Sequence, residues 1–96
     1  MFMKKYDTDG KVIVAVCDSD IIGKKFKEGN LVLKLEESFY KGCEACENEV
    51  KEALACASIA NIAGKRSIAC AVGNGLIDQD TVIYVDGIPH AQMVQL

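Results

Sequence analysis

The stretch KVIVAVC, Lys11 to Cys17, is the strongest strand signal in the chain and decides the fold class. Its β-branched residues follow one another almost without interruption, which is typical of a strand buried on both faces. Phe2 to Asp7 forms a second expected strand, and Asp9-Gly10 between the two is a hairpin turn signal. We therefore expect the first two strands to pair antiparallel.

Shorter signals follow this hairpin. Asp18 to Gly23 is interpreted as a single capped turn that the glycine ends. Glu28-Gly29-Asn30 marks another turn, and Leu31 to Leu35 alternates weakly, as a strand does. Phe39-Tyr40 is bulky and aromatic, so it is expected to anchor the next connection to the core.

Two helices are predicted in the second half of the chain. The first spans about Glu44 to Ala60, and an apolar stripe with the spacing i, i+3, i+4 and i+7 supports it. That stripe consists of Val50, Ala53, Leu54 and Ala57. The second spans about Gly64 to Val72, with Ile68, Ala69 and Val72 facing inward, and Asn74-Gly75 ends it.

The final segment returns to strand signals. Thr81 to Val85 is a predicted strand, Asp86-Gly87 a turn, and Pro89 is expected to interrupt the ladder before a short edge strand at Ala91 to Gln95. Strands, two helices and strands in this order predict a single α+β domain over residues 1–96. Its sheet would be mixed or mostly antiparallel with the helix pair on one face. An edge strand would also allow a homodimer.

Composition excludes several classes of protein. The 96 residues carry a formal net charge of −3, which argues against indiscriminate nucleic-acid binding but allows a local basic patch. With no Trp, three Tyr and three Phe, the chain is poor in base-stacking side chains. No apolar run approaches the roughly 20 residues of a membrane span, and the start lacks a signal peptide. We expect a cytoplasmic protein with no membrane contact and no cofactor.

The segment NIAGKRS, Asn61 to Ser67, places a glycine and two cations at an expected helix start. A nucleotide-binding P-loop requires Gly-x4-Gly-Lys-Ser/Thr between a strand and a helix. Ile59 occupies the position of the first glycine, Arg66 occupies that of the magnesium-binding hydroxyl, and a helix is predicted before them. Nucleotide hydrolysis is therefore excluded here.

Two interpretations of the same segment remain. Free backbone N–H groups at a helix start could hold an anion together with Lys65 and Arg66. Cations at this end are mildly unfavourable to the helix, and such a local conflict is a hint of function. Alternatively, the segment is a helix–helix corner in which Asn61 caps, Gly64 permits the bend and the charges face water.

Five cysteines occur in the chain, and Cys43 and Cys46 form a CxxC motif. One CxxC provides half of a zinc site, and no second CxxC or CxxH completes it, so no metal site is expected. At a helix start the pair could form a redox dithiol, and Pro89 downstream resembles the cis-proline of thioredoxin-like proteins. The alternative is two partly exposed cysteines in a turn. For Cys17, Cys56 and Cys70, core packing is the preferred interpretation.

Two polar groups are further candidates for a site. His90 and Gln92 flank Ala91 after a rigid proline and could line the mouth of a pocket, although a hydrogen-bonded structural histidine is the alternative. The second group is a basic cluster around Phe26, which consists of Lys24, Lys25 and Lys27. If this cluster lies near Lys65, the two form the basic face expected for RNA or another polyanion. The alternative is that these lysines are solvated in a loop.

Three long segments resemble a known family. They are CDSDIIGKKFKEGNLVLKLEESFYKG (17–42), ASIANIAGKRSIACAVGNGLID (57–78) and VIYVDGIPHAQ (82–92). They are similar to an archaeal family of small uncharacterised proteins, the domain of unknown function numbered four hundred and twenty-four. The resemblance spans about Val12 to Gln92, leaves out Cys43 and Cys46, and implies an archaeal cytoplasmic protein. It implies no particular reaction.

These observations lead to three hypotheses. The first is a non-enzymatic binding module for an anionic partner such as RNA or a translation component, with contacts from the lysines named above, Lys65 and Arg66. The second is a small-ligand-binding protein or enzyme that uses Asn61, Arg66, His90 and Gln92. The third is a dithiol oxidoreductase that uses Cys43 and Cys46.

Overall fold

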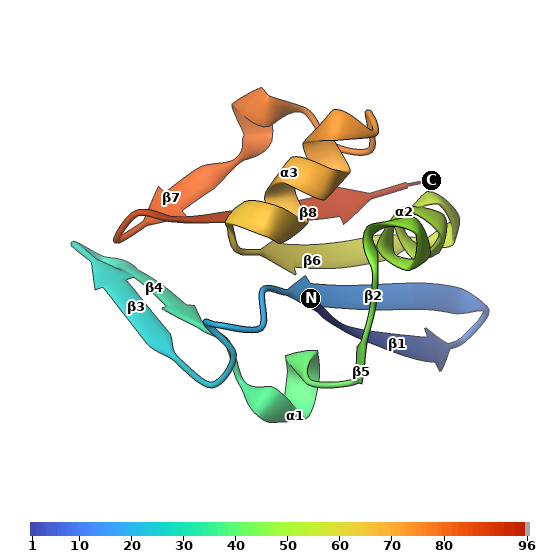
Figure 1. Ribbon diagram of the computed structural model, residues 1–96, viewed down its shortest axis with the longest axis horizontal. Coiled ribbons are helices and arrows are strands. Elements are labelled where there is room, and N and C mark those ends of the chain that lie inside the picture. The colour runs from blue at the N-terminus through green and yellow to red at the C-terminus, as the bar shows by residue number, and fades with distance from the viewer. Residues whose placement is uncertain (96) are drawn as a thin grey trace.

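A computed structural model describes residues 1–95, which form a six-stranded mixed sheet covered on both faces (Figure 1). Only β2 and β6 run parallel, and the other neighbouring strands of this sheet pair antiparallel. The parallel pair joins the N-terminal hairpin to the C-terminal strands. In order across the sheet the strands are β5 (Cys43–Glu44), β1 (Phe2–Thr8), β2 (Lys11–Cys17), β6 (Ile59–Ala63), β8 (Ile88–Val94) and β7 (Ile83–Val85).

The KVIVAVC stretch is β2, near the middle of the sheet, and its predicted hairpin with β1 is confirmed. Its side chains alternate between two cores, because successive strand residues point to opposite faces. Val14 and Val16 lie in the core under the helices, and Ala15 and Cys17 lie in the core on the other face. All four have an exposed fraction of 0%. The expectation of a strand buried on both faces is therefore correct.

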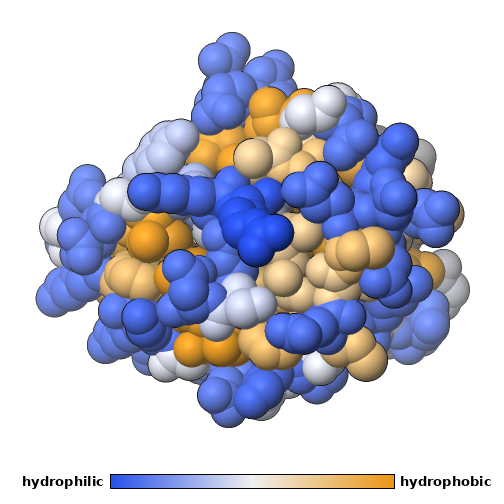
Figure 2. Space-filling model, in the orientation of Figure 1, coloured by the Kyte–Doolittle hydropathy of each residue, from blue (hydrophilic) through white to orange (hydrophobic). Residues whose placement is uncertain are grey.

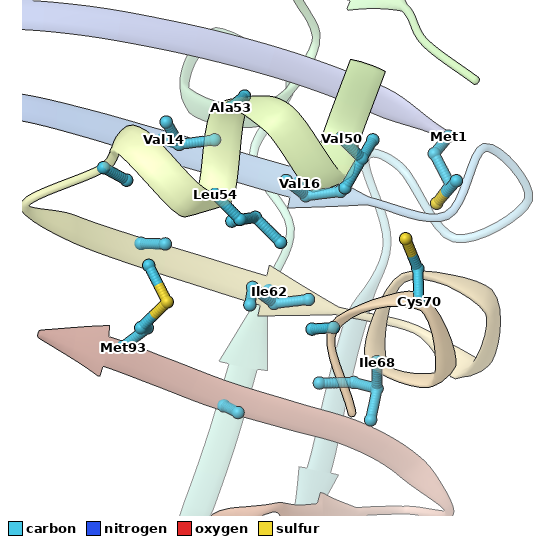
Figure 3. Close-up of a cluster of buried hydrophobic side chains, with 14 residues drawn as sticks. Met1, Val14, Val16, Val50, Ala53, Leu54, Ile62, Ile68, Cys70 and Met93 are labelled. Carbon is cyan, nitrogen blue, oxygen red and sulfur yellow. The ribbon is translucent and has the colours of Figure 1, made fainter. Parts of the chain in front are cut away.

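Two helices cover one face of the sheet, as predicted. They are α2 (Glu47–Cys56) and α3 (Lys65–Gly73), and both lie in front of the sheet in Figure 1. Figure 3 shows Leu54 of α2 and Ile68 of α3 pointing into the same cluster as Ile62 of β6. Val50 and Ala53 are also buried, so the predicted apolar stripe of the first helix is real.

The opposite face is covered at one end by a hairpin and a short helix. The hairpin pairs β3 (Lys25–Glu28) with β4 (Leu31–Lys34), and α1 (Glu37–Tyr40) follows it. Leu33, Leu35 and Tyr40 pack here against the second face of the central strands. The expected anchoring role of Tyr40 is thus observed, and the α+β fold class is confirmed.

The predicted first helix was too long. It ends at Cys56, and the next five-residue element, Ile59–Ala63, is strand β6. The alanines in this stretch favour a helix in isolation. In the fold Ala60, Ile62 and Ala63 are buried between strands and layers, where small side chains allow close packing. Tertiary burial therefore overrides local helix propensity.

Several smaller predictions also need correction. Lys25–Glu28 is a strand rather than a loop, and a 3-10 turn, Gln79–Thr81, precedes the shortened strand β7. Ala69 and Cys56 are exposed rather than buried. Pro89 lies inside β8, where its carbonyl accepts from the Gly64 N–H at 2.9 Å, so the ladder continues through it. β8 lies between β6 and β7 and is no edge strand over that span.

None of the helices in the described part of the chain is long and apolar enough to cross a membrane.

Truncating the core should cost more stability than truncating the surface. Leu54→Ala removes a side chain with no exposure, so the free energy of unfolding should fall by about 2–5 kcal/mol. Val94→Ala is the control, because that side chain is 66% exposed and should change stability by less than about 0.5 kcal/mol. Urea unfolding followed by circular dichroism measures both. Similar losses in the two variants would contradict the assignment of Leu54 to the core.

Candidate functional site

The predicted site at NIAGKRS is built on a carboxylate that comes from another strand. Asp18 follows β2 directly, and its Oδ2 accepts from the Arg66 N–H at 2.9 Å. Its Oδ1 accepts from the Ser67 N–H at 2.8 Å and from the Ser67 hydroxyl at 2.7 Å. Asp18 and Ser67 are both buried. The start of α3 is therefore capped from a distance of nearly fifty residues along the chain.

This arrangement corrects the sequence-based view of the segment. Asn61 lies within β6 and is not the cap, and Gly64 is the residue at the N-cap position. The turn joins a strand to a helix, so there is no helix–helix corner. Two of the backbone N–H groups expected to be free for an anion already bind Asp18. An external anion would have to be held by side chains.

Gly64 is needed at this turn for two reasons. Its φ of 104° lies in a region that side-chain-bearing residues rarely adopt. A Cβ added there would lie 2.3 Å from the Asp18 Cγ, which is far inside van der Waals contact. A glycine at this position therefore allows the Asp18 carboxyl to approach closely. Its presence needs no bound ligand as an explanation.

A groove of about 520 Å³ opens beside this turn. Lys65 and Arg66 line one side, and both side chains are exposed. The apolar lining comes from Met1, Ile21 and Ile88, and the Asp18–Asp20 segment contributes carboxylates. The groove thus brings two cations near acidic groups, one of which already binds the helix start.

Asn61, His90 and Gln92 come together elsewhere, on the face of the sheet opposite the helices. Ala63 pairs with His90 and Asn61 with Gln92 across β6 and β8, and the Gln92 Nε2 donates to the Asn61 Oδ1 at 3.0 Å. His90 and Gln92 line a separate hollow of about 250 Å³. Arg66 lines the groove at α3 instead. The structure therefore gathers three of the four residues of the second hypothesis and leaves Arg66 apart.

Burial of His90 disfavours a positive charge in this hollow. Burial lowers the pKa of its imidazole below the usual value of 6.5, because desolvation disfavours the charged form. His90, Asn61 and Gln92 are then three neutral polar groups. They suit hydrogen bonding to a neutral ligand better than neutralisation of an anion.

The predicted lysine cluster lies on the β3–β4 hairpin and includes one lysine that the sequence interpretation missed. Lys25 and Lys34 are direct cross-strand partners, and Lys27 pairs with Val32. These three lysines alternate with the inward residues Phe26 and Leu33, so they occupy the outer face of the hairpin and are exposed. Recognising Lys25–Glu28 as a strand would have revealed Lys34, because the pairing register follows from the Gly29-Asn30 turn.

Lys24 links this hairpin to the groove at α3. Its backbone N–H donates to the Ile21 carbonyl at 3.1 Å, and Ile21 lines the groove. Lys24 is exposed and directly precedes β3. A single turn, from Ile21 to Lys24, thus leads from the groove at α3 to the hairpin lysines.

Cys43 and Cys46 lie beside α2. Cys43 is in β5, and Cys46 is the N-cap of α2, where its N–H donates to Glu49 at 3.0 Å. Both thiols are free and exposed. Among residues 1–95 no three potential metal ligands gather, and no peptide bond is cis, including the one before Pro89.

Cys17 is no candidate nucleophile, because burial, with Asp18 and Asp20 nearby, raises the pKa of its thiol to about 12.

Comparisons with known proteins agree with the fold. A family model described as a protein of unknown function (DUF424) matches residues 6–96. The crystal structure of an uncharacterized conserved protein from Methanopyrus kandleri is similar with a TM-score of 0.78, at 23% identity, over 99% of this chain and 93% of that chain. At this identity the likeness concerns the fold. No curated protein sequence is significantly similar to the chain.

Removing the Asp18 carboxylate should destabilise the protein. Asp18→Ala leaves the buried Ser67 N–H and hydroxyl without their acceptor, so the free energy of unfolding should fall by about 2–4 kcal/mol. Asp78→Ala is the matched control, because Asp78 caps only the exposed 3-10 turn and should cost about 1 kcal/mol or less. Urea denaturation measures both. Equal losses of unfolding free energy in the two variants would show that the Asp18 contact stabilises the fold no more than an exposed cap does.

The imidazole of His90 should titrate below pH 6.5 in the folded protein. Because its folded pKa is depressed, its neutral form stabilises the fold above the unfolded pKa, and this contribution is lost as the pH falls through the folded pKa. NMR titration of the single histidine measures the midpoint. His90→Gln should remove this part of the acid destabilisation. A midpoint at or above 6.5 would contradict the burial of His90.

Proposed function

We propose that this chain, which belongs to the DUF424 family, is a non-enzymatic binding module for a polyanion, with RNA as the foremost candidate. The observation that carries the proposal is the pairing of Lys25 with Lys34 on the outer face of the β3–β4 hairpin. Like charges directly opposite each other destabilise a sheet. In this hairpin the two lysines repel each other on an exposed face, where core packing does not require lysine. Bound phosphates would offset the repulsion.

We infer that the hairpin lysines form one end of a longer cationic path. Lys27 lies two residues from Lys25 on the same face, roughly 7 Å along the strand. Lys24 follows the turn that lines the groove at α3, and Lys65 and Arg66 line that groove. A repeating anion can contact several of these groups at once, whereas a single small anion cannot.

The start of α3 contributes to this path through side chains. Cations at a helix N-terminus are mildly unfavourable to the helix, but the Asp18 carboxylate there offsets part of that cost. Lys65 and Arg66 are exposed and therefore free to reach outward. Arg66 can bind a phosphate with two parallel hydrogen bonds, and Lys65 acts as a point charge.

The cationic path suits RNA, alone or within a translation component. It does not suit indiscriminate binding of nucleic acid over the whole surface. The chain has a net charge of −3, so its attraction to phosphate is confined to the cationic path. Such a contact recognises the spacing of backbone charges and not the base sequence. The proposed module would position an RNA backbone without catalysing a reaction.

One observation favours a second candidate function, the binding of a small neutral ligand. The amide pair Asn61–Gln92 and the neutral His90 lie beside a hollow of about 250 Å³. Convergent hydrogen-bonding groups at a hollow are typical of ligand sites, but small-molecule pockets usually exceed about 300 Å³. We therefore rank this candidate below polyanion binding.

Removing the paired lysines should weaken RNA binding and its salt dependence. For Lys25→Gln with Lys34→Gln, the slope of log K against log salt for a single-stranded RNA should decrease by about 1.4, because each lost phosphate contact contributes about 0.7. Affinity should fall similarly for oligonucleotides of different sequence. Fluorescence anisotropy at several salt concentrations measures both quantities.

The matched control is Lys5→Gln with Lys51→Gln, which removes the same charge from β1 and α2, on the helix side of the sheet. Its salt slope should stay close to that of the unaltered chain. Lys65→Ala with Arg66→Ala should resemble the hairpin variant. RNA binding that ignores salt, or that the control weakens as much as the hairpin variant does, would refute the proposed function.

A further inference from the structure

On the face of the sheet that carries α2 and α3, the helices leave strand β1 uncovered. α2 packs on β2, and α3 packs on β6 and β8. Neighbouring strands are about 4.8 Å apart and packed helices about 10 Å apart, so each helix covers roughly two strands. Two helices are therefore too few for six strands. Figure 1 shows that no helix lies in front of β1.

A groove of about 530 Å³ occupies this uncovered place, between β1 and α2. From α2 it is lined by residues 49, 52, 53 and 56, which have the spacing i, i+3, i+4 and i+7 of one helix stripe. From β1 it is lined by residues 3, 5 and 7, which share one face of the strand. The groove is thus bounded by two regular surfaces that face each other, as in a packed layer with one element missing.

Its lining combines an apolar floor with negative charge. Met3, Val12 and Ala53 are at least partly buried and belong to the core under the helices. Above them Asp7, Glu49 and Glu52 provide three carboxylates, and Lys5 provides the single ammonium. A hydrogen bond from the Cys46 N–H lowers the pKa of Glu49, which keeps its carboxylate charged. The charge therefore selects a cationic occupant.

We propose that a basic amphipathic helix of a partner protein docks in this groove and completes the helix layer. Its apolar stripe would cover Met3, Val12 and Ala53, and its lysine or arginine side chains would reach Asp7 and Glu52. The strand β1 has seven residues, about 23 Å, which matches a helix of about 14 residues. This is the helix-in-groove mode of recognition.

A second copy of the chain fits the groove less well. The helix that it could present there, α2, exposes Glu47 and Glu52, which would face the same carboxylates. Like charges that meet across an interface oppose binding. The other exposed helix, α3, has nine residues and its cations only at its first two positions.

The groove lies apart from the proposed polyanion surface. The β3–β4 hairpin packs on the opposite face of the sheet, around Ala15 and Cys17, whereas the groove lies on the helix side. Lys65 and Arg66, at the start of α3, are also on the helix side, but they line a different groove. In the view of Figure 2 hydrophilic side chains surround apolar patches on the face that carries the helices. The inference is therefore independent of RNA binding, and either can fail alone.

The test uses the full chain and a fluorescein-labelled amphipathic peptide of leucine, alanine and lysine, about 14 residues long. Anisotropy should detect binding of this peptide, and the same peptide with glutamate in place of lysine should not bind. Asp7→Asn with Glu52→Gln should weaken binding roughly tenfold. Glu49 is left unchanged, because its carboxylate caps α2.

The matched control, Glu36→Gln with Asp80→Asn, removes two exposed carboxylates outside the groove and should weaken binding by no more than about twofold. Cys56 gives a local readout, because it lines the groove and its thiol is exposed. The lysine peptide should slow alkylation of Cys56 several-fold. Cys46, about 15 Å away at the other end of α2, should react at an unchanged rate.

Four outcomes would overturn the inference. The lysine peptide could fail to bind, the groove and control variants could weaken it equally, or Cys56 could stay fully reactive when peptide is bound. Protection of Cys56 that rises with the concentration of the chain alone would assign the groove to a second copy instead. Lys25→Gln with Lys34→Gln should leave peptide binding unchanged, which separates this test from that of the proposed function.

Discussion

The structure depends on the contact between the Asp18 carboxylate and the start of α3. Asp18 directly follows the central strand β2, and α3 begins just after β6, the parallel neighbour of β2. One buried side chain therefore fixes where a strand ends, where a helix begins and how closely the two connections pass. Gly64 makes this approach possible, because any Cβ there would overlap the carboxyl. The parallel pair β2–β6 in turn holds the N-terminal hairpin to the C-terminal strands.

The same contact changes how the neighbouring cations, Lys65 and Arg66, could bind an anion. A helix start with free N–H groups attracts an external anion, but here an internal carboxylate occupies that position. Lys65 and Arg66 are therefore available to an anion only through their exposed side chains, and they line the same groove as Ile21, in the turn that leads to the hairpin lysines. The charged side chains thus form two separate regions around the sheet. Cations gather on and near the hairpin, and carboxylates gather between β1 and α2.

Much of the fold was predictable from local patterns. β1, β2, β4 and α3 lie within a few residues of their predicted positions, because each carries a clear period or turn signal. β6 was not predictable in this way, because Ala60 and Ala63 have strong helix propensity and only burial between two strands makes them extended. The prediction that Pro89 interrupts the ladder was wrong, because its carbonyl can still accept a hydrogen bond from the Gly64 N–H within the ladder.

The sequence by itself determined the residue types of the candidate sites: the lysines, the Lys65-Arg66 pair, the polar residues near Pro89 and the exposed cysteines. Tertiary structure decided which of them meet. It placed Lys34 opposite Lys25, joined Asn61 to Gln92, and separated Arg66 from His90 by placing them at different hollows. The physical reason is that local propensity acts over a few residues, whereas register and the Asp18 bridge join segments far apart in the chain.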